Sequence, residues 1–143
     1  MPHYSLAITS AGPLISLHIS VSAPRREALV KANKPIPPPV LTQLLVDTGA
    51  SCTNIDSTLI GKLGLMPTGS VLMHTPSTGQ KPVKALTYDV GLILDVGGHQ
   101  VSSVSVIETD FSDQGFGGLL GRDVLALARM TYSGPDNIVY LSF

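Results

Sequence analysis

The sequence contains a single cysteine, Cys52, and no tryptophan among its 143 residues. One cysteine excludes an internal disulfide and a zinc site built from several cysteines. Charged residues make up only 13% of the chain and the net charge is −1. Such a chain lacks the basic surface that binds nucleic acid or anionic membranes. We therefore expect neither nucleic acid nor a membrane among its partners.

Long apolar runs are also missing. The best candidate, Leu92 to Val96, already contains Asp95 and is far shorter than a membrane span. The first residues, Met1 to Leu6, lack the basic and apolar regions of a signal peptide. These absences predict a soluble, cytoplasmic protein, and its length fits a single domain over residues 1–143.

Short segments with alternating apolar residues dominate the chain, and 14 glycines and 11 prolines separate them. This pattern predicts β-strands joined by turns. We expect strands in residues 4–21 (a hairpin turning at 11–13), 40–46, 71–75, 83–86, 88–94, 99–107, 130–132 and 138–143. Only two short helices are expected in the body of the chain, one over residues 57–63 with Asp56 as N-cap and one from Arg122 to about Met130. The predicted fold is all-β, a closed barrel with one or two short helices.

Residues 22–39 interrupt this pattern. Residues 24–32 can form two helical turns that Pro24 enters without loss of a hydrogen bond. Residues 34–39 contain four prolines and can be neither helix nor central strand. We interpret residues 22–39 as a proline-rich surface excursion between two strands, with no part in catalysis.

The most informative segment is Leu44-Leu45-Val46-Asp47-Thr48-Gly49-Ala50-Ser51. An apolar strand here delivers one carboxylate, that of Asp47, into a turn of small residues, where it is partly removed from water. Gly49 allows another backbone to approach closely. Taken alone, the triplet is also typical of an ordinary turn after a strand, with Asp47 as a turn residue.

A second motif, Leu119-Leu120-Gly121-Arg122-Asp123, follows about seventy residues later. With both motifs in this order, the chain resembles the retropepsins and their cellular single-domain relatives among the aspartic proteases. The resemblance rests on Leu45 to Ser51, on Leu119 to Gly121, and on the helix start at Arg122. It implies the acid-protease barrel, with this chain as one half of a two-fold symmetric dimer.

The resemblance also assigns roles. Asp47 would be catalytic, and Thr48, Gly49 and Ala50 would support the active-site turn, Thr48 by bonding across the two-fold axis. Leu120 and Gly121 would pack under this turn. A flap formed by Pro76, Ser77, Thr78 and Gly79 would close over an extended polypeptide substrate.

The other candidate residues have simpler interpretations. Cys52 has no histidine near it in sequence and is expected to be a small, partly buried apolar residue. The four histidines are scattered without ligand spacing, so we expect no metal and no cofactor. Asp123 is expected to have a structural role, paired with Arg122 or another arginine.

These observations predict an aspartic endopeptidase that acts as a homodimer. The alternative is a catalytically silent dimer with the same fold that binds peptides or proteins, since a fold does not fix a function. Whether the last strand, 138–143, joins an interchain sheet stays open at this point.

Overall fold

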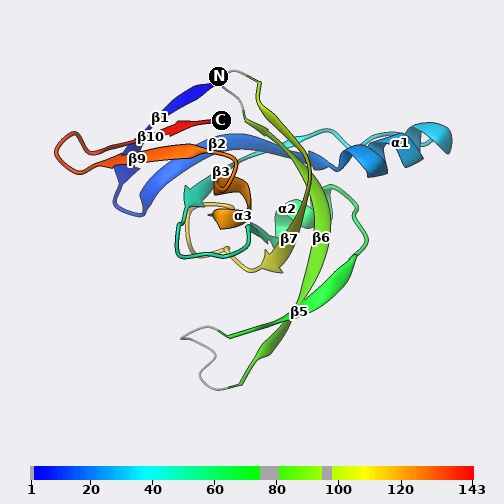
Figure 1. Cartoon of the computed structure of the whole chain (residues 1–143). Helices are drawn as coiled ribbons and strands as arrows, with labels where there is room; N and C mark the ends of the chain where they lie inside the picture. Colours follow the sequence, from blue (N-terminus) through cyan, green and yellow to red (C-terminus); the bar gives the residue numbers. More distant parts are fainter. Residues whose placement is uncertain (1, 75–80, 95–97) are drawn as a thin grey trace.

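The structure is a computed structural model that describes residues 2–74, 81–94 and 98–143. These residues form ten strands and three short helices (Figure 1). No helix among them is long and apolar enough to cross a membrane. The all-β prediction is confirmed.

Six strands close into a barrel. They are β2 (Gly12–Val21), β3 (Val40–Val46), β8 (Gly118–Leu120), β4 (Asn54–Asp56), β7 (Gln100–Thr109) and β6 (Val83–Leu94), hydrogen-bonded in that order. The ring closes because β6 also pairs with β2, with Leu17 opposite Leu94 and Val21 opposite Val90. At Gly91 the strands approach closely: a Cβ would lie 2.6 Å from the Ser20 hydroxyl oxygen and 3.1 Å from the Val21 carbonyl oxygen, so a larger residue would force the Ser20 side chain to move.

The barrel is filled by the inward-facing side chains of these strands. Alternate residues of β2 (Ile15, Leu17 and Ile19) are at most 1% exposed, as the period of two in a strand requires. Apolar residues of the other barrel strands join them in one continuous core: Leu44, Val46, Ile55, Val90, Leu92, Leu94, Val106 and Leu120. Burial of this set supplies the main stabilisation of the fold.

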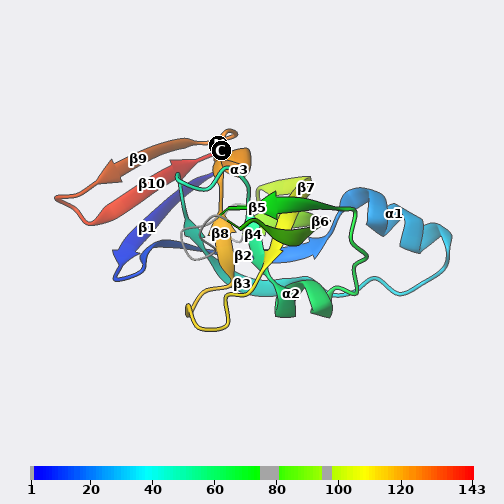
Figure 2. The same cartoon turned by 90° about the horizontal axis from the view of Figure 1, so that it is seen from below.

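Two extensions leave the barrel. On one side, β1 (His3–Thr9), β10 (Ile138–Ser142) and β9 (Arg129–Ser133) continue the sheet outward from β2. We call these three strands the terminal arm. On the other side, β5 (Gly69–Met73) pairs with the first half of β6 to form a hairpin that projects from the barrel (Figures 1 and 2).

The excursion between β2 and β3 contains α1 (Ala23–Lys31), which protrudes at one end of the molecule (Figure 1). The Ser22 hydroxyl caps it by accepting a hydrogen bond from the Arg25 amide (3.3 Å), and only Leu29 is buried. Residues 34–39 are neither helix nor strand. The predicted surface excursion therefore has the expected local structure.

The predicted helix over residues 57–63 is α2 (Ser57–Lys62), capped by Asp56 as expected. The prediction of a helix from Arg122 to about Met130 was wrong, because α3 (Arg122–Leu125) has only four residues. From Arg129 onward the backbone pairs with β10, so tertiary strand pairing overrides the local helical preference. The two strands predicted at 83–86 and 88–94 are one continuous strand, β6.

Candidate active site

Asp47 lies directly after β3, a central strand of the barrel. β3 pairs with β2 on one side and runs parallel to β8 on the other, with Val46 opposite Leu120. The pairing with β8 extends one residue further, because the amide N–H of Asp47 donates to the carbonyl oxygen of Leu120 (3.0 Å). The strand therefore fixes the backbone of Asp47, and its side chain is half-buried at the end of an apolar strand.

The residues after Asp47 fold into a tight turn around its carboxylate. The Gly49 amide donates to Oδ1 of Asp47 (2.8 Å), and the Ala50 amide donates to the Asp47 carbonyl oxygen (3.2 Å). Within the described part of the chain, Oδ2 of Asp47 accepts no hydrogen bond. One carboxylate oxygen is thus oriented by the turn, while the other is available to a ligand.

The start of α3 holds this turn from the side. The Arg122 amide donates to the Ala50 carbonyl oxygen (2.9 Å), and its Nη1 donates to the Thr48 carbonyl oxygen (2.8 Å). Gly121 lies so close to the turn that a Cβ there would be 2.6 Å from the carbonyl carbon and oxygen of Cys52. The contact leaves no room for any side chain at position 121.

A hydrogen-bond network anchors the turn to the barrel. Thr53, which is fully buried, donates its amide N–H to Oδ2 of Asp123 (2.9 Å) and its hydroxyl to Oδ1 (2.7 Å). The Thr53 hydroxyl oxygen in turn accepts from the Gly121 amide (3.1 Å). The network joins the two sequence motifs across about seventy residues of chain.

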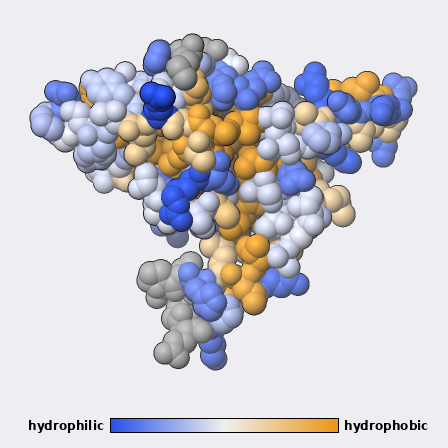
Figure 3. All heavy atoms as spheres, in the orientation of Figure 1, coloured by the Kyte–Doolittle hydropathy of each residue, from blue (hydrophilic) through white to orange (hydrophobic). Residues whose placement is uncertain are grey.

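Most of the expected site residues come together here. Asp47, Thr48, Gly49 and Ala50 form the turn; Leu120, which is fully buried, and Gly121 lie against it. The expected flap residues Pro76, Ser77, Thr78 and Gly79 lie outside the described residues. The hairpin strands that flank them, β5 and β6, carry exposed apolar side chains: Val71, Leu72, Val83 and Leu86. Figure 3 shows apolar surface from the middle of the molecule down to this hairpin.

The sequence did not indicate the role of Thr53, and the arginine partner predicted for Asp123 was wrong. Asp123 accepts hydrogen bonds from Thr53 and from the Val124 amide (2.8 Å), rather than pairing with an arginine. The one signal for Thr53 was a small polar residue six positions after Asp47, which by itself does not reveal a buried partner. The structural role expected for Asp123 agrees with these contacts.

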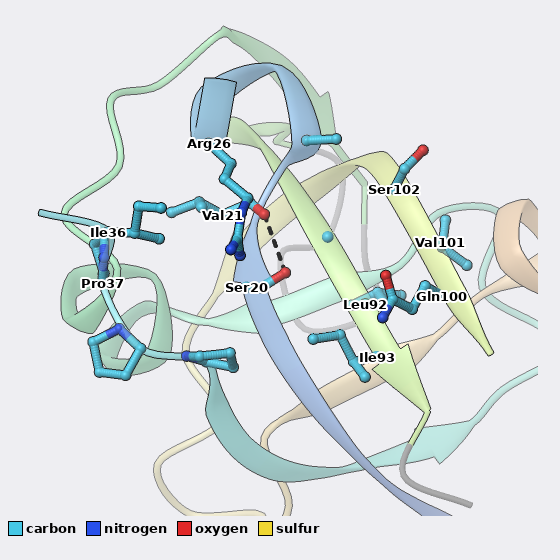
Figure 4. Close-up of a pocket in the computed structure, with 14 residues that line it drawn as sticks. Ser20, Val21, Arg26, Ile36, Pro37, Leu92, Ile93, Gln100, Val101 and Ser102 are labelled. Carbon is cyan, nitrogen blue, oxygen red and sulfur yellow. Dashed lines mark hydrogen bonds between the residues drawn. The ribbon is translucent and has the colours of Figure 1, made fainter. Parts of the chain in front are cut away.

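A separate pocket of about 280 Å³ lies elsewhere, between the excursion and strands β2, β6 and β7 (Figure 4). Arg26, Ile36 and Pro37 line one side, and Leu92 and Gln100 the other. Its lining includes no residue of the Asp47 turn. Among the described residues no group of three or more histidine, cysteine, aspartate or glutamate side chains is placed to hold a metal ion.

Comparison with known proteins points to the part of the chain that contains the Asp47 turn. A family model described as aspartyl protease matches residues 38–124, which contain both motifs. A crystal structure of a retropepsin-like aspartic protease from Rickettsia conorii matches with a TM-score of 0.59 and 17% sequence identity, over 97% of this chain and 89% of that chain. No curated protein sequence matches. The structural likeness shows a retropepsin-like fold, and the family match, over more than half of the sequence, shows that this chain belongs to the aspartyl protease family.

Proposed function

We propose that this chain is one subunit of a homodimeric aspartic endopeptidase, in which Asp47 and the partner subunit's Asp47 form the catalytic pair. The observation that carries the proposal is the half-buried carboxylate of Asp47, held through Oδ1 by the Gly49 amide at the end of β3. The chain supplies one such motif, and two carboxyl groups are needed, so the second comes from a second copy.

The chemistry needs the two carboxyl groups in different protonation states. Two adjacent carboxylates resist simultaneous ionisation, so the pair shares one proton, as in aspartic proteases generally. The ionised member removes a proton from a water molecule, whose oxygen forms a bond to the peptide carbonyl carbon. The protonated member gives its proton to the carbonyl oxygen. As the C–N bond of the tetrahedral intermediate breaks, the carboxyl group that took the water proton gives it to the leaving nitrogen. The other carboxylate takes a proton from a hydroxyl group of the intermediate, which restores the pair with one shared proton.

The rest of the turn would position the reacting groups. Gly49 has no side chain, so a substrate backbone can approach the carboxylates, and a Cβ there would lie 3.1 Å from Oδ1 of Asp47. The apolar side chains of the β5–β6 hairpin favour a polypeptide substrate with apolar residues. An extended peptide would bind by pairing its backbone as an added strand.

The test is a comparison of wild type with Asp47→Asn on a mixed peptide library between about pH 4 and pH 8, the range in which a shared carboxyl proton is retained or lost. The matched control is Asp113→Asn, the same change at an exposed aspartate outside the site. We expect wild type and the control to cleave, and Asp47→Asn to fold and associate normally but not cleave.

Two results would contradict the proposal. Cleavage that persists in Asp47→Asn would remove Asp47 from the mechanism. If neither wild type nor Asp47→Asn cleaves, yet both bind peptide or a protein equally well, the chain is a binding module with this fold.

A further inference from the structure

The pocket between the proline-rich excursion and strands β2, β6 and β7 has the dimensions of a small-molecule site (Figure 4). Its volume of about 280 Å³ is close to the lower end of the range for ligand pockets, about 300–1,000 Å³. A water molecule occupies about 30 Å³ in the liquid, so the pocket has room for about nine non-hydrogen atoms. A ligand that fills it is therefore a small organic molecule.

The barrel side of this pocket is an irregular part of the sheet. β6 and β7 change register between Val90 and Leu92, so Gly91 has no residue opposite it in β7. Val90 and Leu92 belong to the core, which places position 91 on the outer face of the barrel. Such irregularities are frequent next to functional sites. Because glycine has no side chain, nothing at position 91 fills the pocket.

The excursion forms the opposite side of the pocket from apolar and rigid residues. Ile36 and the three prolines at positions 37–39 line this side. Proline has a fixed φ angle, so this wall loses little conformational freedom when a ligand binds. Ile93 and Val101 also line the pocket, on the barrel side. The two sides together offer a preformed site to the apolar body of a ligand.

Arg26 supplies the charge of the pocket, since no other charged residue is among the described residues that line it. Its amide N–H donates to the Ser22 carbonyl oxygen (2.9 Å) in the first turn of α1, which fixes its backbone. Figure 4 shows the Arg26 side chain extending from α1 toward Ser20. Within the described part of the chain its guanidinium makes no ion pair and no hydrogen bond. A positive charge without a partner therefore lies beside apolar walls.

We propose that this pocket binds a small organic carboxylate, with its carboxylate on Arg26 and its apolar body between Ile36 and Ile93. The planar guanidinium donates two parallel hydrogen bonds to a carboxylate, and its single positive charge balances a monoanion. A phosphate dianion would keep an unbalanced negative charge and would leave the apolar walls without contacts. Because the lining includes no residue of the Asp47 turn, the inference is independent of the proposed function.

The test titrates the isotope-labelled chain with 4-methylpentanoate and follows the backbone amide signals by NMR. The control ligand is 4-methylpentanamide, which has the same shape and no charge. We expect the acid to bind with a dissociation constant on the order of 1 mM, as suits a ligand of about eight non-hydrogen atoms. The amide should bind at least about tenfold more weakly. The largest signal changes should come from residues that line the pocket, such as Ser20 and Gly91.

Two variants with matched controls test the two halves of the site. Arg26→Gln should weaken binding of the acid about tenfold or more, whereas Arg25→Gln, at the neighbouring exposed arginine that does not line this pocket, should leave it unchanged. Ile36→Ser should weaken binding about threefold or more through lost apolar contact, and Val30→Ser, at an exposed residue of α1, should not. All four changes lie in the excursion, outside the barrel, and circular dichroism reports whether each variant is folded.

Three outcomes would overturn the inference: equal binding of the acid and the amide, unchanged binding in Arg26→Gln, or inorganic phosphate binding as tightly as 4-methylpentanoate. The first two would remove the role of the charge, and the third would remove the role of the apolar walls. Asp47→Asn should bind the acid as wild type does. A failure to cleave peptides therefore leaves this inference standing, and a failure to bind the acid leaves the protease proposal standing.

Discussion

The Thr53–Asp123 network gives a stability prediction whose size follows from the structure. Asp123→Ala removes the acceptor of two hydrogen bonds from Thr53, at 2.9 Å and 2.7 Å. Thr53 is fully buried, so water cannot replace the lost acceptor without opening the structure. Hydrogen bonds to a charged group contribute about 1.5–3 kcal/mol each, and two of them give about 3–6 kcal/mol. Because Asp123 itself is half-exposed, we expect a loss near 3 kcal/mol.

Urea denaturation followed by circular dichroism measures this loss as a change in the free energy of unfolding. The matched control, Asp113→Ala, removes an exposed carboxylate from a loop and should change stability by less than about 0.5 kcal/mol. Thr53→Val completes a double-mutant cycle, in which we expect a coupling energy of about 1 kcal/mol or more. A loss below about 1 kcal/mol in Asp123→Ala, or no coupling to Thr53, would refute the assignment of this network as the anchor of the turn.

Two further predictions concern other parts of the fold. Gly121→Ala should disrupt the turn and lower both stability and cleavage, since its Cβ would lie 2.6 Å from Cys52 backbone atoms. Thermal unfolding and cleavage assays check this. An unchanged melting temperature and an unchanged cleavage rate would contradict the close contact. Burial and, secondarily, the Glu108 carboxylate raise the pKa of Tyr88 above its ordinary value. The folded state therefore holds the Tyr88 proton more tightly than the unfolded chain does. The free energy of unfolding that this contributes is fully present below about pH 10, and it is lost as pH rises through the pKa of Tyr88 in the folded state. Tyr88→Phe should make the free energy of unfolding fall less steeply between about pH 9 and pH 11, as measured by denaturation. The same slope against pH in the variant and in wild type would contradict this prediction.

Local features of the fold could be predicted because neighbouring residues determine them. The end of β3 at Asp47, the Asp56 cap and the proline at the start of α1 agree with the structure. Features that depend on distant partners were not predicted. The barrel closes where β6 pairs with β2, with Gly91 opposite Ser20, and the sequence does not indicate that these two strands meet.

In the candidate site, too, local features could be predicted and contacts between distant residues could not. A turn of small residues at Asp47 could be predicted from the sequence, because the hydrogen bonds of this turn join residues two or three positions apart. The partner of Asp123 lies 70 positions away, and the residues next to Asp123 do not indicate it. The early end of α3 depends on strand pairing, because from Arg129 onward the chain pairs with β10, the next strand along the sequence.

The central claim is that two Asp47 carboxylates from two chains act together. Its most direct test mixes wild type with Asp47→Asn at constant total concentration, under conditions where heterodimers form freely and native mass spectrometry verifies them. In an equal mixture only about one quarter of the dimers carry two Asp47 residues, so cleavage should fall to about one quarter of the wild-type rate. Cleavage at about one half would mean that each subunit acts alone, and would contradict the account.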